Sequence, residues 1–159
     1  MSALKVVGVL IVAISGIVAS YTLNAAARRS LEQTEGFIAL IRRLRSDIEC
    51  FAMPLPSALA RCPAEVYVKC GYVAQDAPRS VLSFVEACAV SDAESCKAMR
   101  AFARSIGRGY REEQLAICDY YTDMLEERRQ RLYEQLPNKT KRNSAMCLCG
   151  ALAVVILLI

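Results

Sequence analysis

Histidine is absent from the whole chain of 159 residues. This absence removes the usual general base, the commonest metal ligand and every catalytic triad that relies on an imidazole. The cysteines form no C-x-x-C pair, the spacing typical of zinc and redox sites. We therefore expect a protein that is not an enzyme and that carries neither a cofactor nor a metal ion.

The sequence also lacks an internal repeat, a low-complexity linker and any alternating apolar and polar run long enough for a good strand. A strong excess of one charge is missing too, since the net charge is only +4. All 16 acidic residues and every basic residue except Lys5 lie between Asn24 and Asn143, with the signs mixed. This pattern is typical of a solvated helical surface. We predict no nucleic-acid partner and no small-molecule substrate.

Charge is missing altogether from the two ends of the chain. Residues 6–23 and 144–159 contain no charged side chain. A bilayer core of about 30 Å needs about 20 apolar residues of helix, so the first segment fits and the second is short. Basic residues before the second segment can snorkel to the headgroups and extend it. We predict transmembrane helices over 1–23 and 144–159, which flank a helical domain over 24–143.

Basic residues at the membrane ends predict the orientation. Arg28 and Arg29 follow the first apolar segment, and Lys139, Lys141 and Arg142 precede the second. By the positive-inside rule, the domain between them faces the cytoplasm. These five residues are the predicted membrane-flanking set, and membrane lipid is an expected partner.

Two alternatives remain open at this stage. The first apolar run followed by Ala25-Ala26-Ala27 also resembles a secretory signal with a cleavage site. The domain would then be a secreted helical protein stapled by disulfides, whereas in a reducing cytoplasm its cysteines are small buried hydrophobes. The cysteines concerned are Cys50, Cys62, Cys70, Cys88, Cys96 and Cys118. The second alternative is a membrane-bound enzyme that uses a carboxylate pair or a cysteine nucleophile, which would need a perturbed pKa in a pocket.

Apolar residues recur at three- and four-residue steps along the domain, which predicts an all-α fold. The first helix should continue from the membrane segment to Phe51, before Pro54 and Pro56. Short helices are expected over 57–61, 63–70, 78–89 and 92–106. Gly71 should close the second of these, and Ser91 with Glu94 should form a capping box at the last. The final helix should run over 111–136, where Pro137-Asn138 breaks it.

Two apolar stripes predict how the long helices pack. The first stripe consists of Leu31, Phe37, Ile38, Ile41, Leu44, Ile48 and Phe51, and the second of Leu115, Cys118, Thr122, Leu125 and Leu132. Since one helix leaves the membrane and the other returns to it, we expect an antiparallel pair of about 25 residues each. With about 120 residues, the domain has room for one core.

Clusters of charged residues on the long helices are the candidate partner-binding surfaces. They comprise Arg42, Arg43, Arg45, Glu112, Glu113, Glu126, Glu127, Arg128, Arg129 and Arg131. The alternative for each cluster is an ordinary solvated face with i,i+4 pairs, such as Glu127 with Arg131. Of the neighbouring Tyr120 and Tyr121, we expect one in the core and one at the surface.

Several motifs resemble those of the stage III sporulation protein AB family. The stretch from Asp47 to Leu59 is similar to the family's acidic-Ile-x-aromatic motif followed by Pro-Leu-x-x-Ala, and the stretch from Phe102 to Gly107 to its Phe-Gly-x-x-Leu-Gly. The final apolar helix, flanked by Lys and Arg and containing Gly150, fits as well. The residues that carry the resemblance are Asp47, Ile48, Pro54, Leu55, Phe102, Gly107 and Gln114. Departures are Cys50 in place of an aromatic, Ala103 in place of Gly, and the lack of tryptophan.

The resemblance implies a role. It implies a non-enzymatic membrane-anchored assembly or docking subunit of the channel complex that endospore-forming bacteria build between mother cell and forespore. The implied location is the mother-cell membrane that faces the forespore. The cytoplasmic helical domain would be similar to that of the type II secretion platform protein. The implied partners are the cytoplasmic ATPase of the complex and its polytopic membrane subunits.

Overall fold

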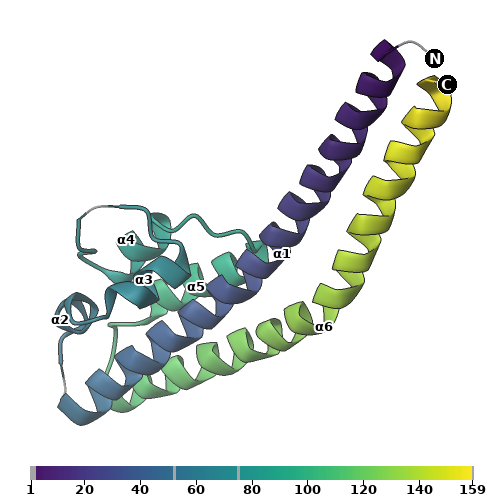
Figure 1. Ribbon diagram of the computed structural model, residues 1–159. Coiled ribbons are helices and arrows are strands. Elements are labelled where there is room, and N and C mark those ends of the chain that lie inside the picture. Colours follow the sequence, from purple (N-terminus) through teal and green to yellow (C-terminus); the bar gives the residue numbers. More distant parts are fainter. Residues whose placement is uncertain (1–2, 52, 75, 159) are drawn as a thin grey trace. The chain divides into compact units, whose positions relative to one another are not determined.

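The computed structural model describes residues 3–51, 53–74 and 76–158 of the chain. Within these residues the chain is mostly helical and has no strand, so the predicted all-α class is confirmed (Figure 1). The helices are α1 Ala3–Phe51, α2 Leu55–Ala60, α3 Ala64–Cys70, α4 Val81–Glu86, α5 Ala93–Ser105 and α6 Arg111–Leu158.

The chain divides into two compact units. The first consists of 1–28 and 133–159, and the second of 29–132, so that α1 and α6 each contribute to both units. In the first unit, the Asn143 side-chain amide donates to Asn24 Oδ1 at 3.4 Å, which links the two helices. The domain boundaries expected from the sequence, at 23/24 and 143/144, stay a prediction.

The second unit contains the hydrophobic core. Its fully buried apolar residues on α1 are Phe37, Leu40, Ile41 and Leu44. On α6, Cys118, Leu125 and Leu132 are buried, and the shorter helices add side chains such as Phe84 and Phe102. The predicted stripes are thus confirmed over most of their length. Phe51 is an exception at 64% exposed, because it is the last residue of α1, where Arg61 lies over its ring at 5.9 Å.

The ends of the short helices differ from those predicted. Pro54 is the N-cap residue of α2, which begins at Leu55. Pro56 does not delay the helix, because a proline in the first turn lacks an N–H group that would have no helical partner there. α4 is shorter than the predicted 78–89. Ser80 caps it by accepting a hydrogen bond from the Ser83 backbone N–H at 3.1 Å, so the preceding residues stay outside the helix. Beyond its end the chain pairs with Gly71, whose φ of 79° closes α3 as predicted.

Two further expectations were wrong. Asp92, and not Ser91, caps α5, because its carboxylate accepts from the Ser95 backbone N–H at 2.9 Å. Pro137 does not break the last helix, which continues through it to Leu158. A proline removes one hydrogen bond at a cost of about 3 kcal/mol. The residues on both sides of Pro137 are helical, so α6 tolerates this loss.

The membrane segments stay predictions. Over the part of the chain that the structure describes, no helix has a stretch that is both long and apolar enough to cross a bilayer. The side chains of 1–13 and 151–159, which form much of the two predicted transmembrane helices, lie outside the described residues, as does that of Lys139. Of the other predicted flanking residues, Arg28, Arg29, Lys141 and Arg142 are exposed.

Candidate docking surfaces

The residues that carry the family resemblance gather at one end of the second unit. Phe102 is fully buried and Ile48 is 5% exposed. Gly107, just beyond α5, has a φ of 85°, and a Cβ on it would lie 3.0 Å from Leu55 Cδ1, so α2 packs directly on this turn. Gln114 on α6 donates to the Gly109 carbonyl at 3.2 Å. The resemblance therefore falls on a structural junction of α2, α5 and α6.

The end of α1 is held at the same junction. Arg111 Nε donates to the Ile48 carbonyl at 3.3 Å, and its Nη2 donates to the Glu49 carbonyl. These carbonyls belong to the last turn of α1, which has no further helical N–H groups to bond. The nearby Asp47 is buried, and its Oδ2 accepts no hydrogen bond from the residues that the structure describes, with Arg43 Nε 3.5 Å away. Arg43 is therefore the countercharge of a buried carboxylate.

The other two candidate arginines of α1 pair with α6. Arg42 bonds to Glu126, and Arg45 Nε donates to Asp119 Oδ1 at 2.6 Å while its Nη1 reaches Glu49. Arg45 lies further along α1 than Arg42, whereas Asp119 precedes Glu126 on α6, so the two helices pack antiparallel as predicted. The hydrogen bond that Arg45 donates to Asp119 raises the pKa of Arg45. Pairing within the unit accounts for these charges, and a role in partner binding stays a prediction.

A polar network joins α1, α5 and α6. Arg128 on α6 donates two hydrogen bonds to the carboxylate of Asp92, from Nη2 to Oδ1 at 2.6 Å and from Nε to Oδ2 at 3.0 Å. Asp92 Oδ2 also accepts from the Ser95 hydroxyl at 2.8 Å, and that hydroxyl lies 2.9 Å from the Thr34 hydroxyl on α1. Arg128 Nη1 reaches Glu94 as well, at 2.6 Å. Arg128, predicted as a partner-binding residue, is a structural clamp of the unit.

Electrostatics at this clamp favours the ionised pair. Burial on its own raises the pKa of Asp92, but the hydrogen bonds from Arg128 and Ser95 outweigh burial and lower the pKa to about 2. The hydrogen bond to Asp92 raises the pKa of Arg128. Only 17% of the Arg128 side chain and 11% of the Asp92 side chain are exposed, so the pair is far from fully screened by water.

The remaining candidates are scattered. Glu112 and Glu113 are exposed in the first turn of α6, where the helix dipole favours carboxylates. Arg129 is half-buried. Tyr121 packs on Phe102 with ring centroids 5.6 Å apart, whereas Tyr120 is 59% exposed, which confirms the split expected for this pair. These residues do not form one surface.

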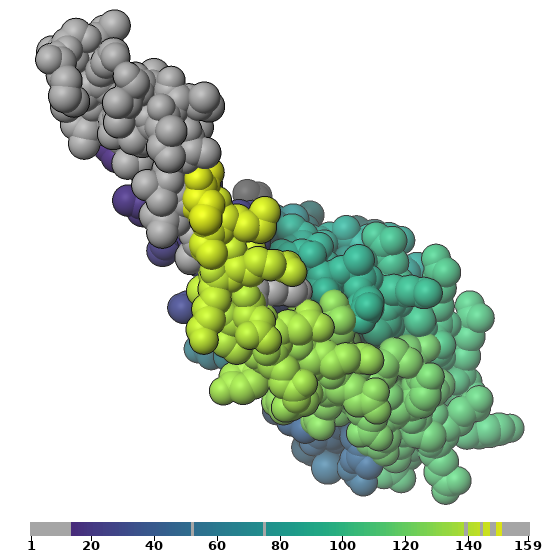
Figure 2. Space-filling view, turned by 90° about the vertical axis from the view of Figure 1, so that its right-hand side faces the viewer, coloured from purple at the N-terminus to yellow at the C-terminus, as the bar shows by residue number. Residues whose placement is uncertain are grey.

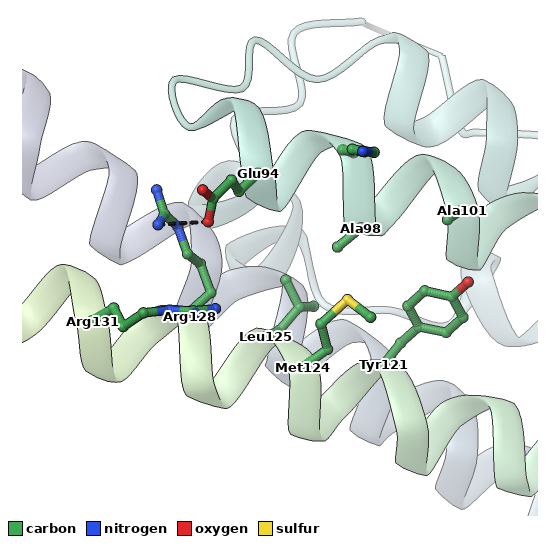
Figure 3. Close-up of a pocket in the computed structure, with 9 residues that line it drawn as sticks. Glu94, Ala98, Ala101, Tyr121, Met124, Leu125, Arg128 and Arg131 are labelled. Carbon is green, nitrogen blue, oxygen red and sulfur yellow. Dashed lines mark ion pairs between the residues drawn. The ribbon is translucent and has the colours of Figure 1, made fainter.

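The structure adds a groove that the sequence did not indicate. It lies between α5 and α6 and has a volume of about 350 Å³ (Figure 3). Small and flexible apolar groups line one part of it, and charged side chains gather at the other end, where Glu94 and Arg128 meet. The lining residues are Glu94, Lys97, Ala98, Ala101, Tyr121, Met124, Leu125, Arg128 and Arg131. In the space-filling view, the teal-green region that contains α5 and the green part of α6 lie next to each other on the face turned to the viewer (Figure 2).

The six cysteines of the helical domain are free thiols. Cys62, Cys70 and Cys118 are buried, as expected for small hydrophobes. Burial raises the pKa of Cys118 to about 11 and that of Cys88 to about 12. Such thiols stay protonated at neutral pH, and a protonated thiol is a weak nucleophile.

Comparison with known protein families gives a match. The family model described as "Stage III sporulation protein AB (spore_III_AB)" matches residues 73–159, which is more than half of the chain. The matched range contains α4, α5 and α6, and therefore Phe102, Gly107 and Gln114, both walls of the groove and the Asp92–Arg128 clamp. No curated protein and no solved structure gives a match.

Proposed function

This chain belongs to the stage III sporulation protein AB family, and we propose that it is a non-enzymatic docking subunit of the channel complex between mother cell and forespore. The observation that carries the proposal is the family match over residues 73–159. The open groove between α5 and α6 supports it, because a partly apolar groove with a charged end is the kind of surface that receives a partner segment.

The proposal includes membrane anchoring through both ends of the chain. The uncharged runs 6–23 and 144–159 and the basic residues beside them support it. We place the second unit in the mother-cell cytoplasm, where the cytoplasmic ATPase and the polytopic membrane subunits of the complex are its proposed partners. The buried apolar stripes of α1 and α6 would keep the shape of the unit fixed while it holds them.

Deletion of the gene tests the role. In the endospore former that carries it, we expect development to arrest after engulfment, because the channel complex would lack a subunit. A plasmid copy of the full chain should restore spore formation, which heat-resistant colony counts measure. Normal spore yield in the deletion strain would contradict the proposed function.

Reporter insertions test the orientation. An enzyme reporter that works only in the cytoplasm should be active when inserted after Asp76, which is exposed in the second unit. The same reporter fused after Ile159 should be inactive, because the last apolar segment would carry it across the membrane. Activity in the opposite pattern would favour the secreted alternative, and intact Met1 or Ser2 in the mature protein would exclude signal cleavage.

A further inference from the structure

The groove between α5 and α6 has features of a recognition site with a definite chemical preference. Building on the proposed docking function, we propose that it binds an amphipathic helix from another protein of the complex. An apolar ridge of that helix packs between α5 and α6, and acidic side chains beside the ridge bind Lys97 on α5 and Arg131 on α6.

The apolar part of the groove suits a helix ridge. Ala98 and Ala101 on α5 are small and leave the groove open, while Met124 on α6 is flexible and only partly buried. Tyr121 closes this end (Figure 3). Methionine adapts to the shape of what it contacts, and ridges of one helix pack into grooves of others at axis distances of 8–10 Å. The volume of about 350 Å³ accommodates side chains of a ridge.

The charged side chains of the groove specify the charge that the occupant should carry. Glu94 is bound to Arg128, and Asp92 is bound to the same guanidinium, so the acidic groups here already have a cation. Among the described residues, Lys97 and Arg131 line the groove without an ion-pair partner. Incoming carboxylates would therefore meet one cation without an ion-pair partner on each wall of the groove, whereas an incoming lysine or arginine would be repelled.

Site-specific photo-crosslinking in sporulating cells tests this proposal. The full chain carries p-benzoylphenylalanine at Ala101 in the groove, and the matched control carries it at Ala116, which is exposed on α6 outside the groove. We expect an adduct from Ala101 only. Mass spectrometry should place it on another protein, in a segment with apolar residues at i, i+3 and i+4 and an Asp or Glu within one turn. If the bulk of the probe at Ala101 blocks the site, the probe at Met124, on the α6 wall of the groove, should give the same adduct.

Charge reversal tests the chemistry of the contact. The double change Lys97→Glu with Arg131→Glu should lower the adduct yield at least tenfold, whereas Lys97→Arg with Arg131→Lys should preserve it. Changing the acidic residue of the crosslinked segment to lysine should restore the adduct in the reversed variant. Adduct with a second copy of this chain, with lipid or with a segment that lacks acidic residues would overturn the proposal. So would a yield that is insensitive to charge, or no adduct from either probe position above the Ala116 level.

The spore phenotype separates this proposal from the function on which it rests. Suppose that the deletion strain arrests, but that the charge-reversed chain restores full spore yield and gives the same adduct yield as the original chain. The groove proposal then fails while the docking function stands. If the deletion strain forms spores normally, the docking function itself fails.

Discussion

Replacing Arg128 with alanine should lower the free energy of unfolding of the second unit by about 3 kcal/mol, since loss of one partner of a mostly buried ion pair leaves the other charge uncompensated. Arg128 holds Asp92 with two hydrogen bonds at 2.6 and 3.0 Å and touches Glu94 as well. An aspartate held at a pKa of about 2 contributes roughly 2 to 3 kcal/mol at neutral pH. This energy includes the hydrogen bonds from both Arg128 and Ser95 to the Asp92 carboxylate. It is similar in size to the loss of about 3 kcal/mol expected for Arg128→Ala.

Thiol reactivity provides the measurement. The buried Cys62, Cys70 and Cys118 should react with a thiol reagent only when the second unit opens, so their labelling against denaturant concentration in detergent reports its stability. Arg131→Ala is the matched control on the same helix, and it should change stability by about 0.5 kcal/mol or less, because Arg131 is exposed. Equal labelling curves for the Arg128 and Arg131 variants would show that the clamp contributes nothing.

The effect of Arg128→Ala should also depend on pH. The pKa of Asp92 in the folded unit lies below its ordinary value, so the stability it contributes is fully present above about pH 4 and is lost as the pH falls through about 2. The difference between the original chain and the Arg128 variant should therefore be constant from neutral pH to about pH 5 and shrink below that. A difference that persists unchanged at pH 2 would point to packing by the Arg128 side chain rather than to the ion pair.

Much of the fold follows from periodicity. The stripe containing Phe37, Ile41 and Leu44 and the stripe containing Cys118 and Leu125 were predictable because a helix buries one face at a fixed repeat. Their antiparallel packing followed from both helices joining the chain ends. Tyr121 in the core and Tyr120 at the surface follow from the same repeat.

The sequence did not reveal the cap of α5, the ion pairs between α1 and α6, or the groove. Each of these depends on residues that are close in space but distant along the chain. Ser91 and Asp92 are both good capping residues, and Asp92 prevails because Arg128, 36 positions away, meets its carboxylate. The pattern Asp92-x-x-Ser95 was the one signal for this cap. The pairing of Arg42 and Arg45 with α6 was not visible in the sequence, because their partners Glu126 and Asp119 are distant along the chain. The groove depends on which faces of α5 and α6 meet, and no spacing within either helix shows that.

The clamp and the groove share a wall. Arg128 lines the groove and also binds Glu94, so its side chain keeps the Glu94 carboxylate occupied. Without Arg128, that carboxylate would be free to attract Lys97, three residues further along the same helix, at i,i+3 spacing. The uncompensated positive charge in the groove therefore depends on Arg128, whose main contacts are structural. A partner-binding defect in an Arg128 variant would not show that Arg128 contacts the partner.

Replacing Leu44 with aspartate should have the largest effect on the second unit. Leu44 has no exposed surface and lies in the core stripe of α1. Removing a buried leucine side chain costs about 2 to 5 kcal/mol, and an unpaired carboxylate in its place adds the cost of burying a charge. The sum is comparable with the whole stability of a typical domain, about 5 to 15 kcal/mol. We expect the second unit to lose cooperative unfolding and its buried cysteines to react without denaturant.

The matched control is Ala39→Asp, since Ala39 lies on the same helix but is exposed. It introduces the same charge into α1 and should leave the labelling curve within about 0.5 kcal/mol of the original. Far-UV circular dichroism should show that helix content falls in the Leu44 variant and is kept in the control. If both variants kept their helix content and protected their buried cysteines equally, the apolar stripe of α1 would have to face a partner rather than the core. The close pairing of α1 with α6 through Arg45 and Asp119, at 2.6 Å, is the reason to expect the core.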